Sequence, residues 1–295
     1  MQQGLEGHKV LVVGAGWLGG PAAEALAAQG AQVWTLRREP PLTPVDGVIS
    51  LTGDIRDPSG DHAWRSALPS QLDAMVVCIA PSQHRGDNHQ STYPAALRSA
   101  LALATQRECR SLIYTSSTGV YGRTDGGVSR EDDTITLRDH RQQALREAEA
   151  ALQHPDMATA VDRTILRVAG LYGPGRNPAN RFRAGVPTGD ADVWCNFSWR
   201  DDVISAIAHL LQSEATPGRC RVFNCADGVP MRASTIARAL GAEQAAAASV
   251  GGANAPSGRS NQQILVDPLR ALGWAPTMRT VFDGLRALGE QVTLR

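Results

Sequence analysis

Short apolar segments alternate with longer helical patterns along most of the chain, and glycine- or proline-rich stretches separate them. Apolar runs of the length of buried strands occur at 10–13, 31–36, 48–51, 74–80 and 111–114. Helical patterns occur at 21–28, 93–105, 138–149 and 203–211. Buried strands that alternate with helices predict an α/β fold with a doubly wound parallel sheet.

The junction between the first strand and the first helix carries the pattern G-x-G-x-x-G. In that context Gly14 permits the tight turn, Gly16 lets a pyrophosphate approach the backbone, and Gly19 lets helix and strand pack closely. The helix also points its free N–H groups at the phosphates. We therefore expect a dinucleotide to contact the residues of this turn, Gly14, Gly16, Trp17, Leu18 and Gly19.

The second strand ends on Arg37 and Arg38, where a fold that prefers NAD usually carries Asp or Glu. Two guanidinium groups there suit a 2′-phosphate, so NADP(H) is favoured and NAD is the less favoured cofactor. The alternative is a solvated arginine pair on a loop.

The carboxyl ends of the next strands predict further contacts. Asp54, with Ile55 beside it, is placed to accept from the adenine amino group, and Asp57 to cap the following helix. Ala80 and Pro81 are expected to face the cofactor. The substrate is expected next to Ser82 and Tyr93, in a polar loop that also contains His84 and His89 and leads into the helix 93–105.

Net charge is zero, which leaves no basic surface signal for nucleic acid. No apolar run is long enough to cross a bilayer, and the polar start gives no signal peptide. The five scattered cysteines favour a reducing, cytoplasmic compartment. No Cys, His or carboxylate cluster completes a metal site near His84 and His89, so no metal is expected. We expect a small-molecule substrate, with no nucleic acid and no membrane as partner.

The strand 111–114 continues into T-S-S-T-G-V-Y-G and an acidic segment. Downstream, L-R-V-A-G-L-Y-G-P-G-R at 166–176, F-S-W-R-D-D-V at 197–203 and L-x-x-L-G-W-x-P at 269–276 follow. Together these motifs resemble the atypical, extended short-chain dehydrogenase/reductases, which are the NAD-dependent epimerase/dehydratase-like proteins. The resemblance covers almost the whole chain and implies a Rossmann-like sheet with a small C-terminal substrate lobe. Relatives often pair through two helices, which makes a homodimer an expectation.

The resemblance places Ser117 at the position of the family's catalytic serine, with Thr118 beside it. The family's Tyr-x-x-x-Lys pair is missing, because Arg141 stands at the Tyr position and Leu145 at the Lys position. That pair matters because a free phenol has a pKa of about 10 and needs a nearby cation to ionise near neutral pH. His140 could instead supply a proton and Arg141 could bind a phosphate or carboxylate. Tyr121 is a minor candidate, and solvated surface residues are the alternative interpretation of His140 and Arg141.

The leading hypothesis is therefore an NADP(H)-dependent oxidoreductase acting on a small polar carbonyl, imine or alcohol, with Ser117 orienting the substrate. An epimerase or dehydratase that retains its cofactor is a variant of it. The rival hypothesis is a non-catalytic NADP(H)-binding sensor or regulatory protein, which the missing Tyr and Lys would suit.

The domain prediction assigns 1–172, with 194–226 returning to it, to dinucleotide binding. It assigns 173–193 and 227–295 to a small substrate lobe. Arg176, in an irregular glycine- and proline-rich segment, and Trp199 are expected to contact the substrate. The segment 243–260 is almost all Ala, Gly, Ser and Asn, and is expected to be a mobile loop.

Overall fold

The computed structural model describes residues 4–41, 43–57, 63–154, 160–184, 192–242 and 260–294. Their contacts divide the chain into two compact units. The first unit comprises 1–117, 140–167 and 204–222, and the second comprises 118–139, 168–203 and 223–295. These ranges differ from the predicted domain ranges, and the substrate-binding role of a second lobe stays a prediction.

Within the described residues, seven strands form one sheet in the order β11-β7-β5-β4-β1-β2-β3. The pairings β1–β2, β2–β3, β1–β4 and β4–β5 are all parallel, and the strand order reverses at β1. The predicted doubly wound parallel sheet is therefore confirmed. Its elements are β1 (Lys9–Val13), α1 (Gly19–Ala27), β2 (Gln32–Arg37), β3 (Val48–Thr52), α2 (Ala63–Ser66), β4 (Ala74–Val77), η1 (Gln83–Arg85), α3 (His89–Gln106), β5 (Ser111–Ser117), α4 (His140–Gln153), β7 (Asp162–Val168), α6 (Arg200–Leu211) and β11 (Cys220–Cys225).

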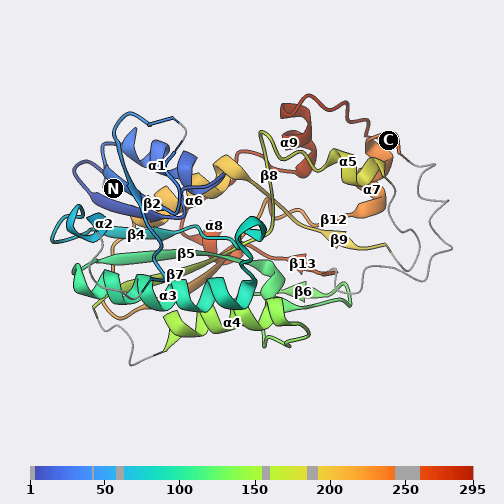
Figure 1. The fold of residues 1–295 in the computed structure, drawn as a ribbon. Coiled ribbons are helices and arrows are strands. Elements are labelled where there is room, and N and C mark those ends of the chain that lie inside the picture. The colour runs from blue at the N-terminus through green and yellow to red at the C-terminus, as the bar shows by residue number, and fades with distance from the viewer. Residues whose placement is uncertain are drawn as a thin grey trace. The chain divides into compact units, whose positions relative to one another are not determined.

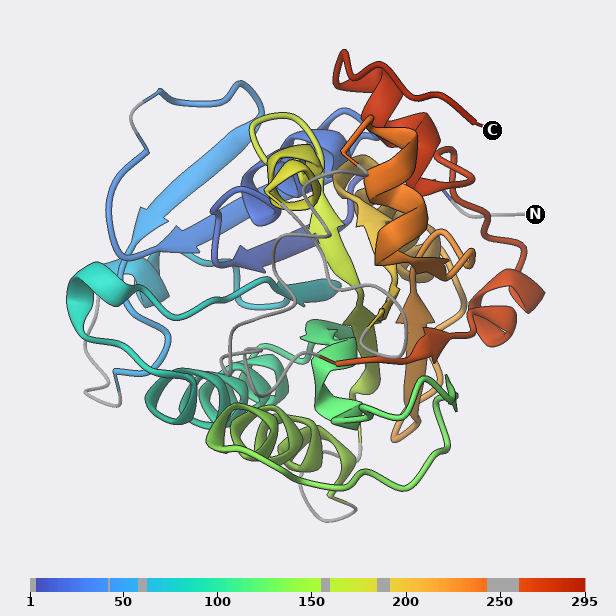
Figure 2. The ribbon, with the colours of Figure 1, turned by 90° about the vertical axis from the view of Figure 1, so that its right-hand side faces the viewer.

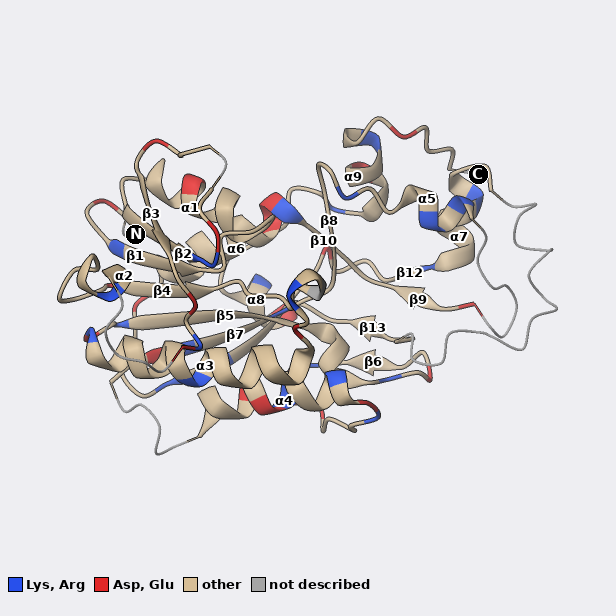
Figure 3. Cartoon of the chain, viewed as in Figure 1, with Lys and Arg blue, Asp and Glu red and all other residues tan. Residues whose placement is uncertain are grey.

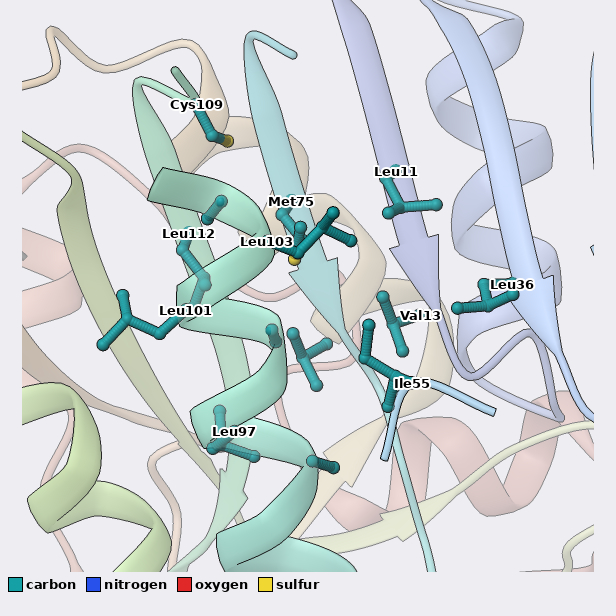
Figure 4. Close-up of a cluster of buried hydrophobic side chains, with 14 of the residues drawn as sticks. Leu11, Val13, Leu36, Ile55, Met75, Leu97, Leu101, Leu103, Cys109 and Leu112 are labelled. Atoms are coloured by element: carbon teal, nitrogen blue, oxygen red, sulfur yellow. The ribbon is translucent and has the colours of Figure 1, made fainter. Parts of the chain in front are cut away.

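Helices cover both faces of this sheet. Figures 1 and 2 show α3 and α4 side by side on one face, and α1 and α6 lie on the other. The central strand β4 is apolar on both sides as a result, and every one of its residues is buried. In Figure 4 the α3 side chains Leu97, Leu101 and Leu103 pack over Met75 and Leu112 of the sheet. This core fixes α3 against the strands that carry the candidate site.

The start of α3 differs from the sequence prediction. The helix begins at His89 instead of Tyr93, because Asn88 caps it. The Asn88 side chain accepts from the Ser91 backbone N–H at 2.8 Å, and the Ser91 hydroxyl accepts from the Asn88 N–H at 3.1 Å. This capping box places His89 on the helix instead of in the predicted polar loop, and it places Tyr93 in the second turn instead of at the first position.

The second unit is built from short elements around its own apolar cluster, which includes Tyr172, Phe197 and Trp199. A short helix, α5, lies in the stretch that was predicted to be irregular. The predicted loop at 243–260 lies outside the described residues except for Ser260. The elements of this unit are η2 (Thr118–Tyr121), β6 (Val128–Ser129), β8 (Gly170–Tyr172), α5 (Ala179–Arg183), β9 (Trp194–Cys195), β10 (Phe197–Trp199), β12 (Met231–Arg232), α7 (Ala233–Ala239), β13 (Gln263–Ile264), α8 (Asp267–Ala271) and α9 (Val281–Ala287).

Acidic and basic residues are interspersed in both units (Figure 3). Among the described residues, no helix combines the length and apolarity that crossing a membrane requires. No group of three or more His, Cys, Asp or Glu side chains gathers in a metal-binding arrangement within the described part of the chain.

Candidate functional site

The glycine turn between β1 and α1 is shaped by close packing on one side and open space on the other. Gly14 has φ +90°, and a Cβ added there would lie 2.4 Å from the Cys78 carbonyl oxygen. A Cβ on Gly19 would lie 2.3 Å from the Gly14 carbonyl oxygen, whereas one on Gly16 would meet nothing within 4 Å. The turn is thus pressed against the end of β4 and leaves Gly16 bare. This cradle fits a dinucleotide pyrophosphate.

The start of α1 supports the same use. Trp17 and Leu18 lead into the helix, whose first turn contains no acidic side chain. Leu18, at the N-cap, makes no side-chain capping hydrogen bond. Within that turn the Gly20 N–H donates to the Gly16 carbonyl at 2.9 Å and Pro21 has no N–H. A bound phosphate would therefore interact mainly with the positive end of the helix dipole.

Arg37 and Arg38 follow one another at the end of β2 but have different surroundings. Among the described residues Arg37 makes no ion pair, and it borders a cavity of about 260 Å³ next to the glycine turn. Ala15, Gly20, Glu24, Thr35 and Ser50 also line this cavity. Arg38 instead donates to Asp87, in the loop that follows β4.

Asp87 also accepts from Arg56 at 2.9 Å, and Arg56 donates to both oxygens of Asp54 at 3.0 and 2.6 Å. Burial raises the pKa of Asp87, but hydrogen bonds from Arg38 and Arg56 outweigh it and bring the pKa to about 2. The pKa of Asp54 is lowered too, since bonds from Arg56 outweigh its burial. The four side chains therefore form a charge-neutral network. The predicted adenine contact of Asp54 remains a prediction, and its carboxylate already accepts from Arg56.

The loop after β4 carries the other predicted cofactor contacts. Ala80 is exposed, Pro81 and Ser82 are half-buried, and the Ser82 N–H donates to Asp87 at 3.2 Å. Ile55, beyond β3, is buried in the core. The segment that Asp57 was predicted to cap begins with 58–62, outside the described residues.

Ser117 is the last residue of β5 and lies at the carboxyl edge of the sheet, half-buried. Its neighbour Ser116 points into the core, where its hydroxyl donates to Glu149 at 2.7 Å. On α4, His140 and Arg141 occupy the first two positions and are exposed, and Leu145 is 2% exposed. The carboxyl edge of the first unit therefore carries Ser117, His140 and Arg141.

A sequence model of the NAD dependent epimerase/dehydratase family matches residues 10–226. The chain belongs to this family. It is 34% identical over 252 residues to Protein YeeZ of Escherichia coli K12, covering 80% of this chain and 85% of YeeZ.

Several solved structures have the same fold. A Methylobacillus flagellatus protein assigned to the NAD-dependent epimerases/dehydratases is 28% identical, with a TM-score of 0.75 over 95% of this chain and 97% of that one. DesIV, a dTDP-glucose 4,6-dehydratase from Streptomyces venezuelae, is 20% identical, with a TM-score of 0.74 over 94% of each chain. MoeE5 in complex with UDP-glucuronic acid and NAD is 21% identical, with a TM-score of 0.73 over 94% of this chain and 96% of that one.

Membership makes this chain an NAD(P)-dependent enzyme of the epimerase/dehydratase family. Two positions depart from the family's Tyr-x-x-x-Lys pattern, and the structure shows what stands at each. Leu145, at the position of the family's lysine, is packed in the core under α4. No cation can act from that position. Arg141, at the position of the family's tyrosine, offers a permanent positive charge and no proton to transfer at neutral pH.

The remaining predicted site residues belong to the second unit. Thr118 is buried at the start of η2, and the Tyr121 hydroxyl donates to the Asn224 side-chain oxygen at 2.7 Å inside that unit. Trp199 is buried and contacts the Tyr172 ring edge-on, with ring centroids 5.3 Å apart. Arg176 is exposed and bridges to Gly173 through the backbone. Tyr121 and Trp199 thus both take part in packing within the second unit, and their roles in the site stay predictions.

The sequence analysis did not predict that Arg56 and Asp87 would belong to an ion-pair network next to the candidate cofactor site. It also did not place His89 on a helix. Arg56 had a local signal, since it follows Asp54 by two residues at a strand end. Asp87 had none, because its partners Arg56 and Arg38 lie 31 and 49 residues away, in the segments that follow β3 and β2. The capping sequence Asn88-x-x-Ser91 was the signal that would have placed His89 on α3.

Proposed function

We propose that the protein binds NADP(H) in preference to NAD(H) and uses it to reduce or oxidise a small polar carbonyl, imine or alcohol. The observation that carries the preference is Arg37. It stands at the end of β2, where NAD-binding relatives usually have an acid that accepts from the ribose 2′-hydroxyl. Its guanidinium has no ion-pair partner among the described residues and borders a cavity beside the glycine turn.

Arg38 contributes less to this preference than the sequence suggested. Its charge is compensated by Asp87, and the network of Arg38, Arg56, Asp54 and Asp87 is neutral as a whole. A 2′-phosphate carries close to two negative charges and needs an uncompensated cation. Arg37 supplies that cation, and Arg38 and Arg56 would hold the rim of the adenosine site.

The bound cofactor supplies the hydride chemistry, and the chain supplies position and proton transfer. Ser117, at the carboxyl edge between the glycine turn and α4, would donate its hydroxyl to the substrate oxygen. Thr118, His140 and Arg141 stay candidates for further contacts, as do Ser82 and Tyr93 from the loop and helix after β4. Arg176 and Trp199 stay predictions for the second unit, as does assembly into a homodimer.

The structural neighbours suggest where to look for a substrate. MoeE5 was solved with UDP-glucuronic acid and with UDP-glucose, and DesIV is a dTDP-glucose dehydratase. We therefore include nucleotide sugars, alongside simple aldehydes and ketones, in the substrate panel. An epimerase or dehydratase reaction on a nucleotide sugar would proceed without net loss of NADPH, whereas a reductase reaction would consume it.

Calorimetric titration of the purified protein with NADPH and with NADH tests the proposal. We expect NADPH to bind roughly tenfold or more tightly than NADH, the range that charge-assisted hydrogen bonds to a phosphate give. Equal affinity would remove the NADP preference while keeping the family's dinucleotide site. No binding of either nucleotide would remove the proposed function.

A further inference from the structure

Ion pairs fasten the loop that follows β4 to the segments that follow β2 and β3. The loop contains η1 and ends at Asp87, whose carboxylate accepts from Arg38, directly after β2, and from Arg56, beyond β3, the latter at 2.9 Å. Arg85, at the end of η1, pairs with Glu39, two residues after β2. Figure 2 shows η1, in turquoise, near the arrowheads of β2 and β3. We call these five side chains the charge clasp, and all of them belong to the first unit.

The strand order shows what the charge clasp crosses. In the sheet β1 lies between β4 and β2, and β3 follows β2 at the edge. A contact from the loop after β4 to a residue after β2 or β3 therefore has to pass the carboxyl end of β1. The glycine turn starts there, at Gly14. In open α/β sheets ligands bind in the crevice outside the carboxyl ends of the strands, at this switch point of the strand order.

The loop is also bonded to itself. The Ser82 carbonyl accepts from the N–H of Arg85 at 3.0 Å and from the N–H of Asp87 at 3.2 Å. The Ser82 N–H donates back to the Asp87 carboxylate at 3.2 Å. These bonds close the loop on itself independently of its ion pairs. We therefore expect the loop to keep its shape and to move as one piece when the ion pairs break.

The inner and outer pairs of the charge clasp differ in burial. The Asp87 side chain is 9% exposed, whereas Arg85 and Glu39 are 42% and 65% exposed. Burial raises the pKa of Asp87, but hydrogen bonds from Arg38 and Arg56 bring it to about 2, so the carboxylate is charged at neutral pH. A hydrogen bond to a charged, partly buried group is worth more than an exposed ion pair. Asp87 thus holds the loop, and the outer pair adds to it.

We propose that Asp87 is a positioning residue that fastens this loop over the adenosine half of the dinucleotide, and that the charge clasp opens whenever the cofactor enters or leaves. This inference rests on the proposed function, because it requires the dinucleotide site. The clasp joins groups of the protein to one another, so we expect the same pairs with and without cofactor. Weakening it should then speed entry and release by the same factor and leave Kd unchanged.

Stopped-flow fluorescence of NADPH measures both rates. The association rate constant comes from the dependence of the observed rate on NADPH concentration, and the dissociation rate constant from a chase with excess NADP⁺. Asp87→Asn removes the charge at the centre of the clasp with little change of shape. Asp73→Asn is the matched control. Asp73 likewise accepts from an arginine, Arg110 at 2.8 Å, and from a backbone N–H, that of Lys9 at 2.9 Å, but it directly precedes β4, at the opposite edge of the sheet.

We expect Asp87→Asn to raise both rate constants about tenfold, the size of effect that charged hydrogen bonds give, and Asp73→Asn to change neither. Unchanged rates in Asp87→Asn would overturn the inference, because the loop would then not cover the path of the cofactor. Faster release with unchanged entry would also overturn it, since Asp87 would then act only on the complex. Faster entry with slower release would reduce its role to repulsion of an anionic cofactor and overturn it as well.

Charge reversal of the outer pair tests the clasp without touching Asp87. Arg85→Glu and Glu39→Arg each replace an attraction by a repulsion at exposed positions, so neither should impair folding. Each single variant should speed entry and release about two- to fivefold, the range of an exposed ion pair. The double variant has the net charge of the wild type and remakes the pair with reversed polarity, so it should return both rates toward the wild-type values. A double variant that exchanges NADPH as fast as the single variants would overturn the inference.

Calorimetry separates the failure of this inference from the failure of the proposed function. If neither NADPH nor NADH binds, the proposed function fails, and the inference fails with it. If NADPH binds to the wild type and to Asp87→Asn with the same Kd and the same rates, the proposed function stands and the charge clasp alone is refuted.

Discussion

Arg167 donates to both carboxylate oxygens of Glu149, at 3.0 and 2.7 Å, and neither side chain is accessible to solvent. Ser116, one residue before the candidate catalytic serine, donates to the same carboxylate. The pair therefore ties α4 to β7 and to the end of β5. It fixes the two elements that carry Ser117 and Arg141.

Removing one member of this pair should be strongly destabilising. Glu149→Ala leaves a buried guanidinium without its counter-charge, which costs about 3–5 kcal/mol in comparable cases. Urea denaturation followed by circular dichroism measures the loss. The double variant Glu149→Leu with Arg167→Met should recover most of it, because no buried charge is left. If Glu149→Ala were as stable as the wild type, the Glu149–Arg167 pair would not be what holds α4 to β7.

Asp227 predicts a pH dependence of stability in the second unit. Its carboxyl is buried, and one oxygen has no hydrogen-bond partner. Burial raises its pKa to about 7, the Val229 N–H and Arg270 lower it, and Asp202 and Asp283 raise it further. Because the folded pKa exceeds that of the unfolded chain, this group contributes most stability when protonated. Its contribution falls between about pH 4 and 7, by up to roughly 4 kcal/mol.

Asp227→Asn should therefore flatten the dependence of the free energy of unfolding on pH in that window and raise stability at pH 8. Denaturant midpoints collected across the window provide the measurement. The same pH dependence in wild type and variant would assign the titration to another group.

Substituting valine at two positions of the glycine turn, Gly14 and Gly16, should have different effects. Gly14→Val should impair folding, because its φ is positive and the Cβ collides with the Cys78 carbonyl. Gly16→Val should fold with an unchanged melting temperature, since its Cβ meets open space, but should bind NADPH at least tenfold more weakly. Thermal melting and calorimetry on both variants separate the two roles. Tight NADPH binding by Gly16→Val would mean that the pyrophosphate lies elsewhere.

The sequence predicted features that depend on local chemistry. The roles of the three glycines could be predicted because the conformation that each allows depends only on neighbours within one turn, at Gly14, Gly16 and Gly19. The alternation of strands and helices around them predicted the parallel sheet. Ser117 was predicted as a site residue because its segment resembles the family's motif, and the structure places it at the end of β5. The N-terminal boundary of α3 was predicted four residues too late, although Asn88 and Ser91 form a local capping signal.

Features that depend on distant partners were not predictable in this way. Asp87 gains its role from Arg38 and Arg56, which reach it only after three strands have aligned. Trp199 is buried edge-on to Tyr172, a packing partner that the sequence did not indicate, and its substrate contact stays a prediction. The sequence likewise contained no sign that Gln90 of α3 would donate to Glu147 of α4, a contact that only helix packing creates.

The central claim is that Arg37 recognises a 2′-phosphate on a dinucleotide held by the glycine turn. The most direct measurement is calorimetric titration of wild type, Arg37→Ser and the control Arg98→Ser with NADPH and NADH. We predict that Arg37→Ser weakens NADPH binding about tenfold to 100-fold and leaves NADH binding unchanged, while Arg98→Ser affects neither. An Arg37→Ser protein that binds NADPH as tightly as the wild type would contradict the claim.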